Sequence, residues 1–283
     1  MAAARAHDAT ARVPFMVAHG DAAPLEVGSV ARAHLGVLQQ WPQWLQVHAR
    51  GVTLLAAPAA RADAMAAMHA RLRAEGLIVG WRDESFALYT VHGRPLGVTI
   101  ERAATRFWGA LTLGAHCNGY VADAHGRPVS LWIARRSFTK ATDPGKLDNL
   151  VGGGVPADQS PRDTVVREAW EEAGLTPAQM HGASRGRVLQ LLRDIPEGLQ
   201  REWIHVYDVC LPVGLTPQNQ DGEVAEVALH PLARALELAA SDEMTVDAAL
   251  VTLDFALRHQ LLSSADAAAL DAIQPPLWQG QAE

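Results

Sequence analysis

The sequence has few of the residues that would place it in several large classes of protein. Two of its 283 residues are cysteines, Cys117 and Cys210, too few for the disulfide framework of a secreted domain. No apolar run approaches the roughly 20 residues of a membrane span. Basic residues number 24 against 31 acidic ones, a net charge of −7, which argues against a general nucleic-acid binder. We therefore expect a cytoplasmic protein that has neither membrane nor nucleic acid as a partner.

The sequence does contain enough apolar residues for a folded core. Hydrophobic residues make up 49% and charged residues 19%, which excludes a disordered or collagen-like chain. At roughly 150 residues per domain, the length predicts about two domains. A Gly- and Pro-containing stretch at 93–97 marks the boundary, so we assign 1–100 to a small α+β domain and 101–283 to a second domain with C-terminal helices. The first fifteen residues lack the apolar core of a secretory signal, and we expect a frayed tail there.

Hydrophobic periodicity and turn residues predict the main helices and strands. In the N-terminal domain, where no residues have ligand spacing, we expect a helix over 30–41, a strand at 52–56, a helix over 61–75, and strands at 77–81 and 86–91. In the second domain we expect a hairpin of 110–121 and 129–135, a strand pair of 187–193 and 203–211, and helices over 161–173, 231–239, 246–261 and 266–273.

The stretch 152–175, GGGVPADQSPRDTVVREAWEEAGL, is the segment that carries chemistry. A glycine run opens it. Ser160 is a good N-cap, and Asp163 three residues later is typical of a capping box. Gly174 is the expected residue after the helix end. The segment therefore predicts a loop followed by a helix with a defined beginning and end.

Three carboxylates lie on one face of this helix, since Glu168, Glu171 and Glu172 are spaced i, i+3 and i+4. Like charges at this spacing destabilise a helix, and two of them also stand at the negative end of its dipole. Hard divalent cations prefer oxygen ligands of this kind, and Mg²⁺ is commonly held by carboxylates together with substrate phosphates. We therefore interpret the cluster as a metal site rather than a solvated acidic face.

At these residues the sequence resembles the Nudix hydrolases, whose box reads G-x5-E-x7-R-E-U-x-E-E-x-G-U, with U aliphatic. Gln159 stands where the box has glutamate, which leaves the Arg–Glu–Glu–Glu core intact. The box positions fall on Gly153, Gln159, Arg167, Glu168, Ala169, Glu171, Glu172, Gly174 and Leu175.

The resemblance implies an α/β/α sandwich that holds the box as loop, helix and loop. It also implies that Glu168, Glu171 and Glu172 are metal ligands, for Mg²⁺ or alternatively Mn²⁺, and that Glu168 deprotonates or orients the attacking water. Arg167 would fix Glu168 through a charge-assisted hydrogen bond. A carbonyl of the glycine run, at Gly152 or Gly153, would add a ligand.

Two further groups of residues are candidates for the same site. Nudix enzymes often take another carboxylate from a later loop, and here Glu223 or Glu226 could supply it; we favour Glu223. Basic residues before the box are candidates for substrate phosphate, namely Arg135, Arg136, Lys140 and Lys146.

The resemblance extends to one Nudix branch, whose members carry an N-terminal domain of unknown function and in some eukaryotes are fused to thiamine pyrophosphokinase. It implies hydrolysis of thiamine diphosphate analogues, notably oxidised forms, to monophosphates. The N-terminal domain would line the pocket or dimerise the protein. The resemblance rests on GAHCNGYV (114–121), LWIARRSFTKATDPGKLDNLVGGG (131–154), HVYDVCLP (205–212), DGEV (221–224) and VTLDFALRH (251–259).

Three alternatives remain beside this hypothesis. Isopentenyl-diphosphate isomerases have a similar segment but need a cysteine that 148–151 lacks, and Cys117 is better interpreted as a buried hydrophobe. A non-catalytic, nucleotide-sensing Nudix module would typically have lost box carboxylates. A hydrolase of nucleotide sugars or dinucleotides has the same box, because the box recognises the diphosphate and not the groups attached to it.

Overall fold

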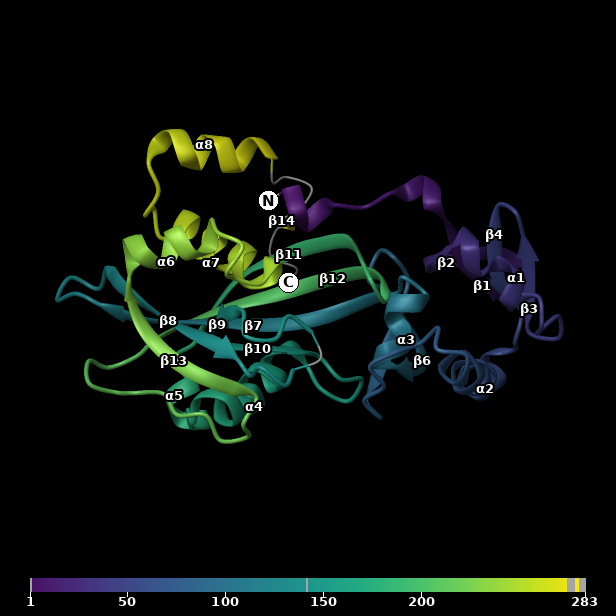
Figure 1. The fold of residues 1–283 in the computed structure, drawn as a ribbon, viewed down its shortest axis with the longest axis horizontal. Coiled ribbons are helices and arrows are strands. Elements are labelled where there is room, and N and C mark those ends of the chain that lie inside the picture. Colours follow the sequence, from purple (N-terminus) through teal and green to yellow (C-terminus); the bar gives the residue numbers. More distant parts are fainter. Residues whose placement is uncertain (1, 141, 274–277, 280–283) are drawn as a thin grey trace.

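The computed structural model describes residues 2–140, 142–273 and 278–279. Figure 1 shows two parts along the long axis of the molecule, an N-terminal part built from β1–β6 and α1–α3 and a larger part that contains a long mixed sheet. None of the helices in the described ranges is long and apolar enough to span a membrane.

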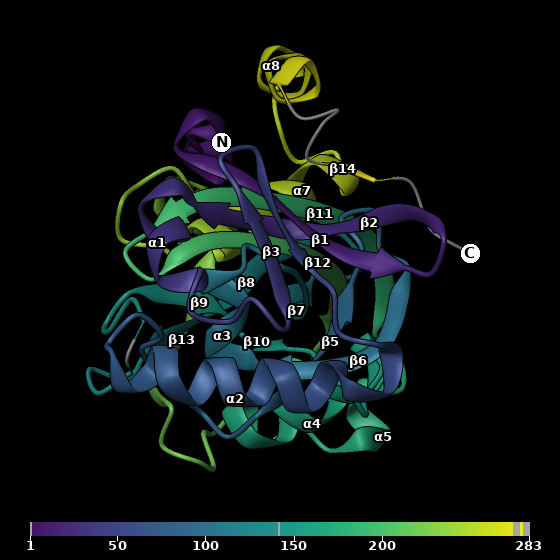
Figure 2. The ribbon, with the colours of Figure 1, turned by 90° about the vertical axis from the view of Figure 1, so that its right-hand side faces the viewer.

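The N-terminal part is an α+β unit with a single hydrophobic cluster, which includes Phe15, Met65, Leu72 and Trp108. Figure 2 views this part face-on, with α2 running across below the β1–β4 sheet. The sheet has the strand order β2-β1-β4-β3. Its elements are β1 (Arg12–His19), β2 (Ala22–Ala31), α1 (Leu35–Leu38), β3 (Leu45–His48), β4 (Gly51–Leu54), α2 (Arg61–Ala74), the hairpin β5 (Ser85–Tyr89) and β6 (Pro95–Glu101), and α3 (Arg102–Phe107).

Two of the elements expected here are wrong. The helix expected over 30–41 is mostly absent, because Val30 pairs with Val13 inside the β1–β2 sheet and the helix α1 is confined to Leu35–Leu38. The strand expected at 77–81 is absent, because this segment is an irregular connection in which Gly80 has a φ of 71°. The helix over 61–75 is confirmed as α2, since its helical pattern is long and is followed by Gly76 in the left-handed region.

The larger part is an α/β/α sandwich, as expected. Figure 1 shows α4 and α5 on one side of the sheet and α6 and α7 on the other. The sheet follows the order β13-β8-β7-β12-β11-β14, with β10 paired to β7 and β9 to β8. Its elements are β7 (Leu111–Ala122), β8 (Pro128–Arg136), β9 (Leu147–Asn149), β10 (Val151–Gly154), α4 (Pro161–Ala173), α5 (Pro177–Met180), β11 (Ser184–Ile195), β12 (Gly198–Cys210), β13 (Val224–Pro231), α6 (Leu232–Ala239), α7 (Val246–Arg258), α8 (Ser264–Ile273) and β14 (Trp278–Gln279).

Strand β7 has different partners along one of its edges, and this positions the site. Residues 114–117 of β7 pair with β10, whereas residues 119–122 pair with β8. The opposite edge pairs in parallel with β12. The two partner strands therefore diverge at Asn118, and Asn149 of β9, which lines a pocket with residues of β8, donates a hydrogen bond to the Asn118 side chain.

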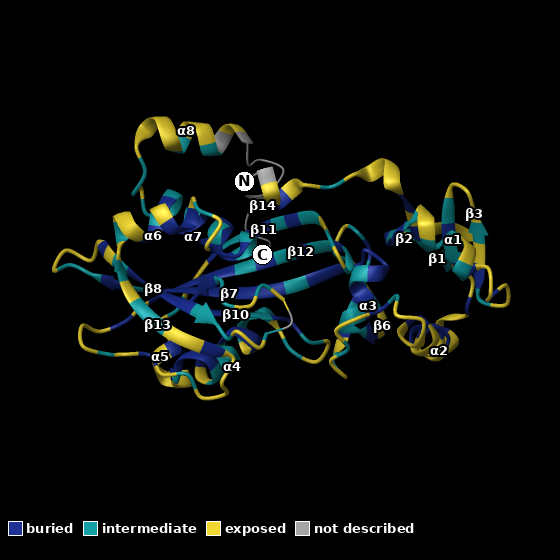
Figure 3. Ribbon diagram, viewed as in Figure 1, coloured by how far each residue is buried: buried dark blue, intermediate teal, exposed yellow. Residues whose placement is uncertain are grey.

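The first residues of the chain pack on the larger part, not as the frayed tail expected from sequence. Ala4 is 1% exposed and lies in a cluster with Leu189, Val206 and Leu250 from β11, β12 and α7. Figure 3 shows that the central strands β7 and β12 are largely buried, whereas α8 is largely exposed. The apolar residues near the N-terminus did not predict the packing of Ala4, because this contact depends on a strand pair nearly two hundred residues away.

Candidate active site

Helix α4 has the boundaries that its end residues predicted. The Ser160 hydroxyl accepts a hydrogen bond from the Asp163 backbone N–H at 3.1 Å, and Ser160 Oγ lies 2.6 Å from Asp163 Oδ2. Gly174 ends the helix with a φ of 66°, in the left-handed region that glycine adopts without strain. Local sequence therefore fixes where this helix starts and stops, and thereby which of its residues face β10.

The glycine run of β10 is required by close contacts on three sides. A Cβ at Gly152 would lie 2.8 Å from Nδ1 of His116, and one at Gly154 would lie 2.6 Å from Cζ of Phe86. A Cβ at Gly153 would overlap the carboxylate of Glu168. None of the three has a positive φ. Because glycine has no side chain, the run leaves room for side chains from β7, α4 and the N-terminal part to approach the backbone of β10.

Arg167 holds two of the box carboxylates. Its Nη2 donates to Glu168 Oε1 at 2.8 Å, and its Nη1 donates to Glu171 Oε2 at 2.6 Å. Its Nε donates to Gln159 Oε1 at 3.2 Å, and that oxygen also accepts a hydrogen bond from Thr164. Gln159 thus supports the arginine through its amide oxygen, at the position where the Nudix box has an acid.

Two of the carboxylates are buried in a way that disfavours their charge. Burial raises the pKa of Glu168, and the neighbouring Glu171 adds to this against the opposing charge of Arg167. Burial also raises the pKa of Glu172 well above its usual value, with a further contribution from Glu168. Glu172 is anchored by the Gly152 N–H, which donates to its Oε2 at 2.8 Å. Additional positive charge beside these carboxylates would therefore stabilise their ionised forms.

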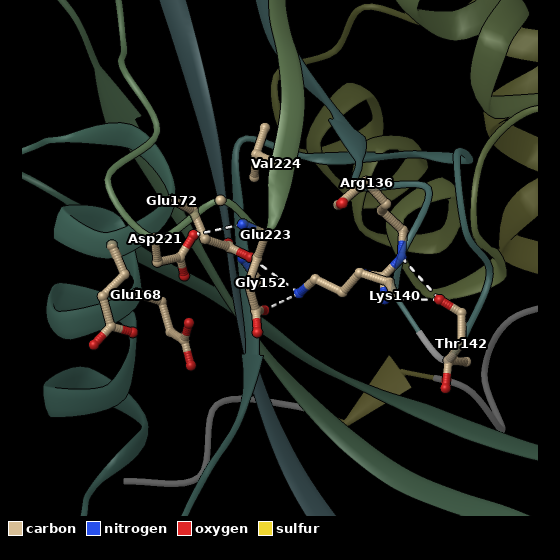
Figure 4. Close-up of polar contacts among 12 residues, drawn as sticks. Arg136, Lys140, Thr142, Gly152, Glu168, Glu172, Asp221, Glu223 and Val224 are labelled. Carbon is tan, nitrogen blue, oxygen red and sulfur yellow. Dashed lines mark hydrogen bonds and ion pairs between the residues drawn. The ribbon is translucent and has the colours of Figure 1, made fainter. Parts of the chain in front are cut away.

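Lys140 connects the later loop to the box helix. Figure 4 shows its side chain extending between Glu223 and Glu172. The Lys140 ammonium donates to Glu223 Oε2, and it lies 3.9 Å from Glu172 Oε1. Burial raises the pKa of Glu223, but the hydrogen bond and charge of Lys140 outweigh it, so that this pKa lies below its usual value. Glu226, the other candidate, is exposed and lies 3.7 Å from Arg135.

The basic residues named from sequence separate into two pairs. Arg136 and Lys140 line a small polar pocket, and Arg136 Nη1 donates to Asp148 Oδ2 at 2.7 Å. Arg135 instead donates to the carbonyl of Gly145 at 2.9 Å, and Lys146 lies 3.5 Å from Asp143. The pocket is lined by Ala134, Arg136, Lys140, Asp148, Asn149, Glu172, Glu223 and Val224.

Sequence reasoning missed two residues of this pocket, Asp148 and Asn149. Both are buried on β9, and Asn149 Oδ1 lies 3.0 Å from Nδ1 of His116. The sequence feature that could have identified them is a pair of polar residues between the apolar residues Leu147 and Leu150, just before the glycine run. Because successive side chains of a strand point to opposite faces, two consecutive polar residues in such a short buried strand indicate polar surroundings on both of its faces.

Comparison with protein families separates the chain into two regions. Residues 114–250 match the NUDIX domain family, and residues 2–112 match a domain of unknown function, DUF4743. The chain therefore carries a Nudix domain with a DUF4743 domain before it. The two matches coincide with the larger part and the N-terminal part of the structure.

The similar proteins include named Nudix hydrolases. The chain is 34% identical over 222 residues to "Nudix hydrolase 20, chloroplastic" of Arabidopsis thaliana, covering 78% of this chain and 59% of that one. It is 35% identical over 210 residues to "Nudix hydrolase 24, chloroplastic" of the same plant, covering 74% and 57% respectively. The chain thus spans less than two thirds of the length of these relatives. A crystal structure of DR0079 from Deinococcus radiodurans aligns with a TM-score of 0.46 and 22% identity, covering 60% of this chain and 97% of that one.

Nudix hydrolases in general use divalent metals, and the residues of this site fit one. Within the described residues, no group of three or more His, Cys, Asp or Glu side chains is arranged so that it could hold a metal ion. The carboxylates instead pair with Arg167 and Lys140. Their oxygen atoms are the donors that hard cations prefer, and burial, which raises the pKa of Glu168 and of Glu172, disfavours their negative charge.

Proposed function

We propose that this protein hydrolyses the diphosphate linkage of an organic diphosphate and releases a monophosphate, using Mg²⁺ or alternatively Mn²⁺. The observation that carries the proposal is the packing of Glu168 and Glu172 against the glycine strand β10, with Arg167 fixing Glu168 at 2.8 Å. The match to the Nudix domain supports it independently.

In this proposal Glu168, Glu171, Glu172 and Glu223 would hold the metal, with the carbonyl of Gly153 as a further ligand. When bound, a divalent cation neutralises phosphate oxygens and lowers the pKa of water. The four carboxylates come from α4 and from the loop before β13, so they would enclose the cation from two sides.

The side chains of this chain perform the remaining tasks. Glu168 accepts the proton of the attacking water at its carboxylate, and burial favours this by raising its pKa. Arg167 positions that carboxylate through its Nη2. Arg136 and Lys140, which line the pocket beside Glu172, would contact a substrate phosphate. Water then adds to one phosphorus, and the bridging oxygen leaves with the other phosphate.

For the substrate we propose thiamine diphosphate analogues, with oxidised forms preferred. This rests on the resemblance of the segments around 114–154 and 205–259 to the branch that is fused to thiamine pyrophosphokinase in some eukaryotes. Nucleotide sugars and dinucleotides offer the same linkage and are the alternative. The cytoplasmic setting and a homodimer stay predictions; two of the relatives are named chloroplastic.

A hydrolysis panel with Mg²⁺ tests both levels of the proposal. It includes thiamine diphosphate, its oxo and oxy forms, ADP-ribose, a nucleotide sugar and a dinucleotide, with phosphorylated products separated by chromatography. Diphosphate hydrolysis is supported if any compound of the panel releases a monophosphate, and if Glu168→Gln loses this activity while Glu226→Gln keeps it. If no compound of the panel is hydrolysed, the proposal is contradicted. A far higher kcat/KM for a nucleotide than for every thiamine analogue contradicts the substrate proposal alone.

A further inference from the structure

The N-terminal part contributes a charged side chain to the edge of the candidate active site. Arg102 begins α3, and a Cβ at Gly154 would lie 3.5 Å from the Cζ of its guanidinium. The preceding residue of the same strand, Gly153, is the one whose backbone the Glu168 carboxylate contacts. Adjacent residues of one strand are 3.8 Å apart between Cα atoms. Arg102 and Glu168 therefore approach neighbouring residues of β10, whose side-chain positions point to opposite faces of the strand.

Two groups of the N-terminal part hold Arg102 in this place. Glu84 accepts a hydrogen bond from its Nη1 at 2.8 Å. Its guanidinium lies 5.4 Å from the centroid of the Phe86 ring, in a cation–π contact. Phe86 is 4% exposed and packs against Gly154. The carbonyl of Ser85 also accepts a hydrogen bond from Ala157 N–H at 2.9 Å, which ties β5 to the loop after β10.

Arg102 keeps unused hydrogen-bond donors. A guanidinium has five N–H groups. Among the residues that the structure describes, Glu84 is the partner of one of them, and no other hydrogen bond involves this side chain. By contrast, Arg167 is committed to two carboxylates and Arg136 to Asp148. The side chain of Arg102 is 39% exposed, so a small molecule can reach it.

The charge of Arg102 acts on the site. It opposes the rise in the pKa of Glu168 and contributes to the lowered pKa of Glu223, to which Arg82 also contributes. Arg82 is exposed on the loop before β5. The N-terminal part therefore adds positive charge near carboxylates of both α4 and the loop before β13.

We propose that Arg102 is a substrate-binding residue, which contacts a phosphate oxygen of the diphosphate from the N-terminal part and makes that part a component of the Nudix site. This deepens the proposed function and rests on it for the identity of the ligand. A guanidinium fixed by one carboxylate and one aromatic face, with its remaining donors free, matches the planar geometry with which arginine binds phosphate. The N-terminal part would then set KM more than kcat.

The test measures binding and turnover separately. Methylenediphosphonate, which cannot be hydrolysed, is titrated calorimetrically in the presence of Mg²⁺ into the full chain. Arg102→Met keeps the stem that packs over Phe86 and removes the charge, and we expect it to weaken probe binding about tenfold or more. On the best substrate of the panel, the same variant should raise KM by a similar factor and leave kcat within about twofold. Glu84→Gln should weaken binding less than Arg102→Met.

The matched control is Arg71→Gln, which removes an exposed arginine of α2, in the same part, that pairs with Glu75. It should bind the probe as the unaltered protein does. If Arg102→Met and a second variant, Arg102→Gln, both retain the original probe affinity and KM, the proposal is overturned, whether or not the panel shows hydrolysis. Failure of the unaltered protein to bind the probe also overturns it. Weakened probe binding without turnover of any panel member keeps this role and removes the proposed hydrolysis.

Discussion

The carboxylate of Glu168 lies so close to the backbone of Gly153 that a side chain at residue 153 would displace it. Gly153 is therefore needed for the position of a neighbouring side chain, and its own φ is not in the left-handed region. The first glycine of the box thus has a direct physical connection to the first of its carboxylates, fifteen residues later in the sequence.

Gly153→Ala should lower kcat by roughly a hundredfold, because displacing a catalytic group by about 1 Å costs on that order. The fold should persist, since overpacking one methyl group costs about 1–3 kcal/mol. Steady-state kinetics on the best panel substrate and thermal melting measure the two effects. Gly36→Ala is the control, because a Cβ there meets no atom within 4 Å. An unchanged kcat in Gly153→Ala would contradict the assigned position of Glu168.

Glu168→Gln should lower kcat by about 10²–10⁴-fold, the usual contribution of a general base. The amide keeps the shape of the side chain but cannot accept the proton of water. Glu226→Gln is the matched control, since Glu226 is exposed and its contact is with Arg135. Single-turnover kinetics separate the chemical step from product release. Equal rates in both variants would remove Glu168 from the proposed role.

Mg²⁺ or Mn²⁺ that binds only the folded protein should raise its free energy of unfolding by about 2.7 kcal/mol at a metal concentration of a hundred times Kd. The melting temperature should rise accordingly. Glu171→Gln combined with Glu172→Gln should abolish this increment. In the absence of metal the double variant should remain folded, because neutralising Glu172 relieves its repulsion with Glu168. Melting curves with and without metal measure this, with Glu226→Gln alongside. A metal-induced shift of unchanged size in the double variant would place the metal elsewhere.

His69 should make the protein lose stability in mild acid. It is 1% exposed, its Nε2 accepts a hydrogen bond from Trp108 Nε1 at 2.8 Å, and burial lowers its pKa from 6.5 to about 4. The unfolded chain takes up this proton below about pH 6.5, whereas the folded protein resists it until about pH 4. The contribution is therefore complete above pH 6.5 and lost between these values, by up to about 3 kcal/mol.

Urea unfolding at a series of pH values measures this loss. His69→Gln keeps an acceptor for Trp108 but does not titrate, so its stability should fall less than that of the unaltered protein between pH 6.5 and 4. His125→Gln, in the exposed turn between β7 and β8, serves as the control. Identical pH profiles for the unaltered protein and His69→Gln would show that His69 does not carry this proton linkage.

The sequence alone determined the features that depend on neighbours along the chain. The ends of α4 follow from Ser160, Asp163 and Gly174, and all three act through contacts within a few residues. The spacing of the carboxylates on that helix, and the hairpin of β7 and β8, are local in the same sense. The fixed spacing of the box carried the resemblance to Nudix hydrolases, and that resemblance implied the α/β/α sandwich.

Tertiary structure decided the features that join distant segments. Val30 is a strand residue because it pairs with Val13, although its spacing to Leu35 and Leu38 is helical. Glu223 contacts Lys140, because the next residue, Val224, pairs with Arg136 at the end of β8, shortly before Lys140 in the chain.

Gly154, the third glycine of the run, is in close contact with Phe86, which belongs to the N-terminal part, and a side chain at residue 154 would collide with it. Such contacts depend on which surfaces pack together. Packing is set by the whole core, so no local pattern of residues encodes it.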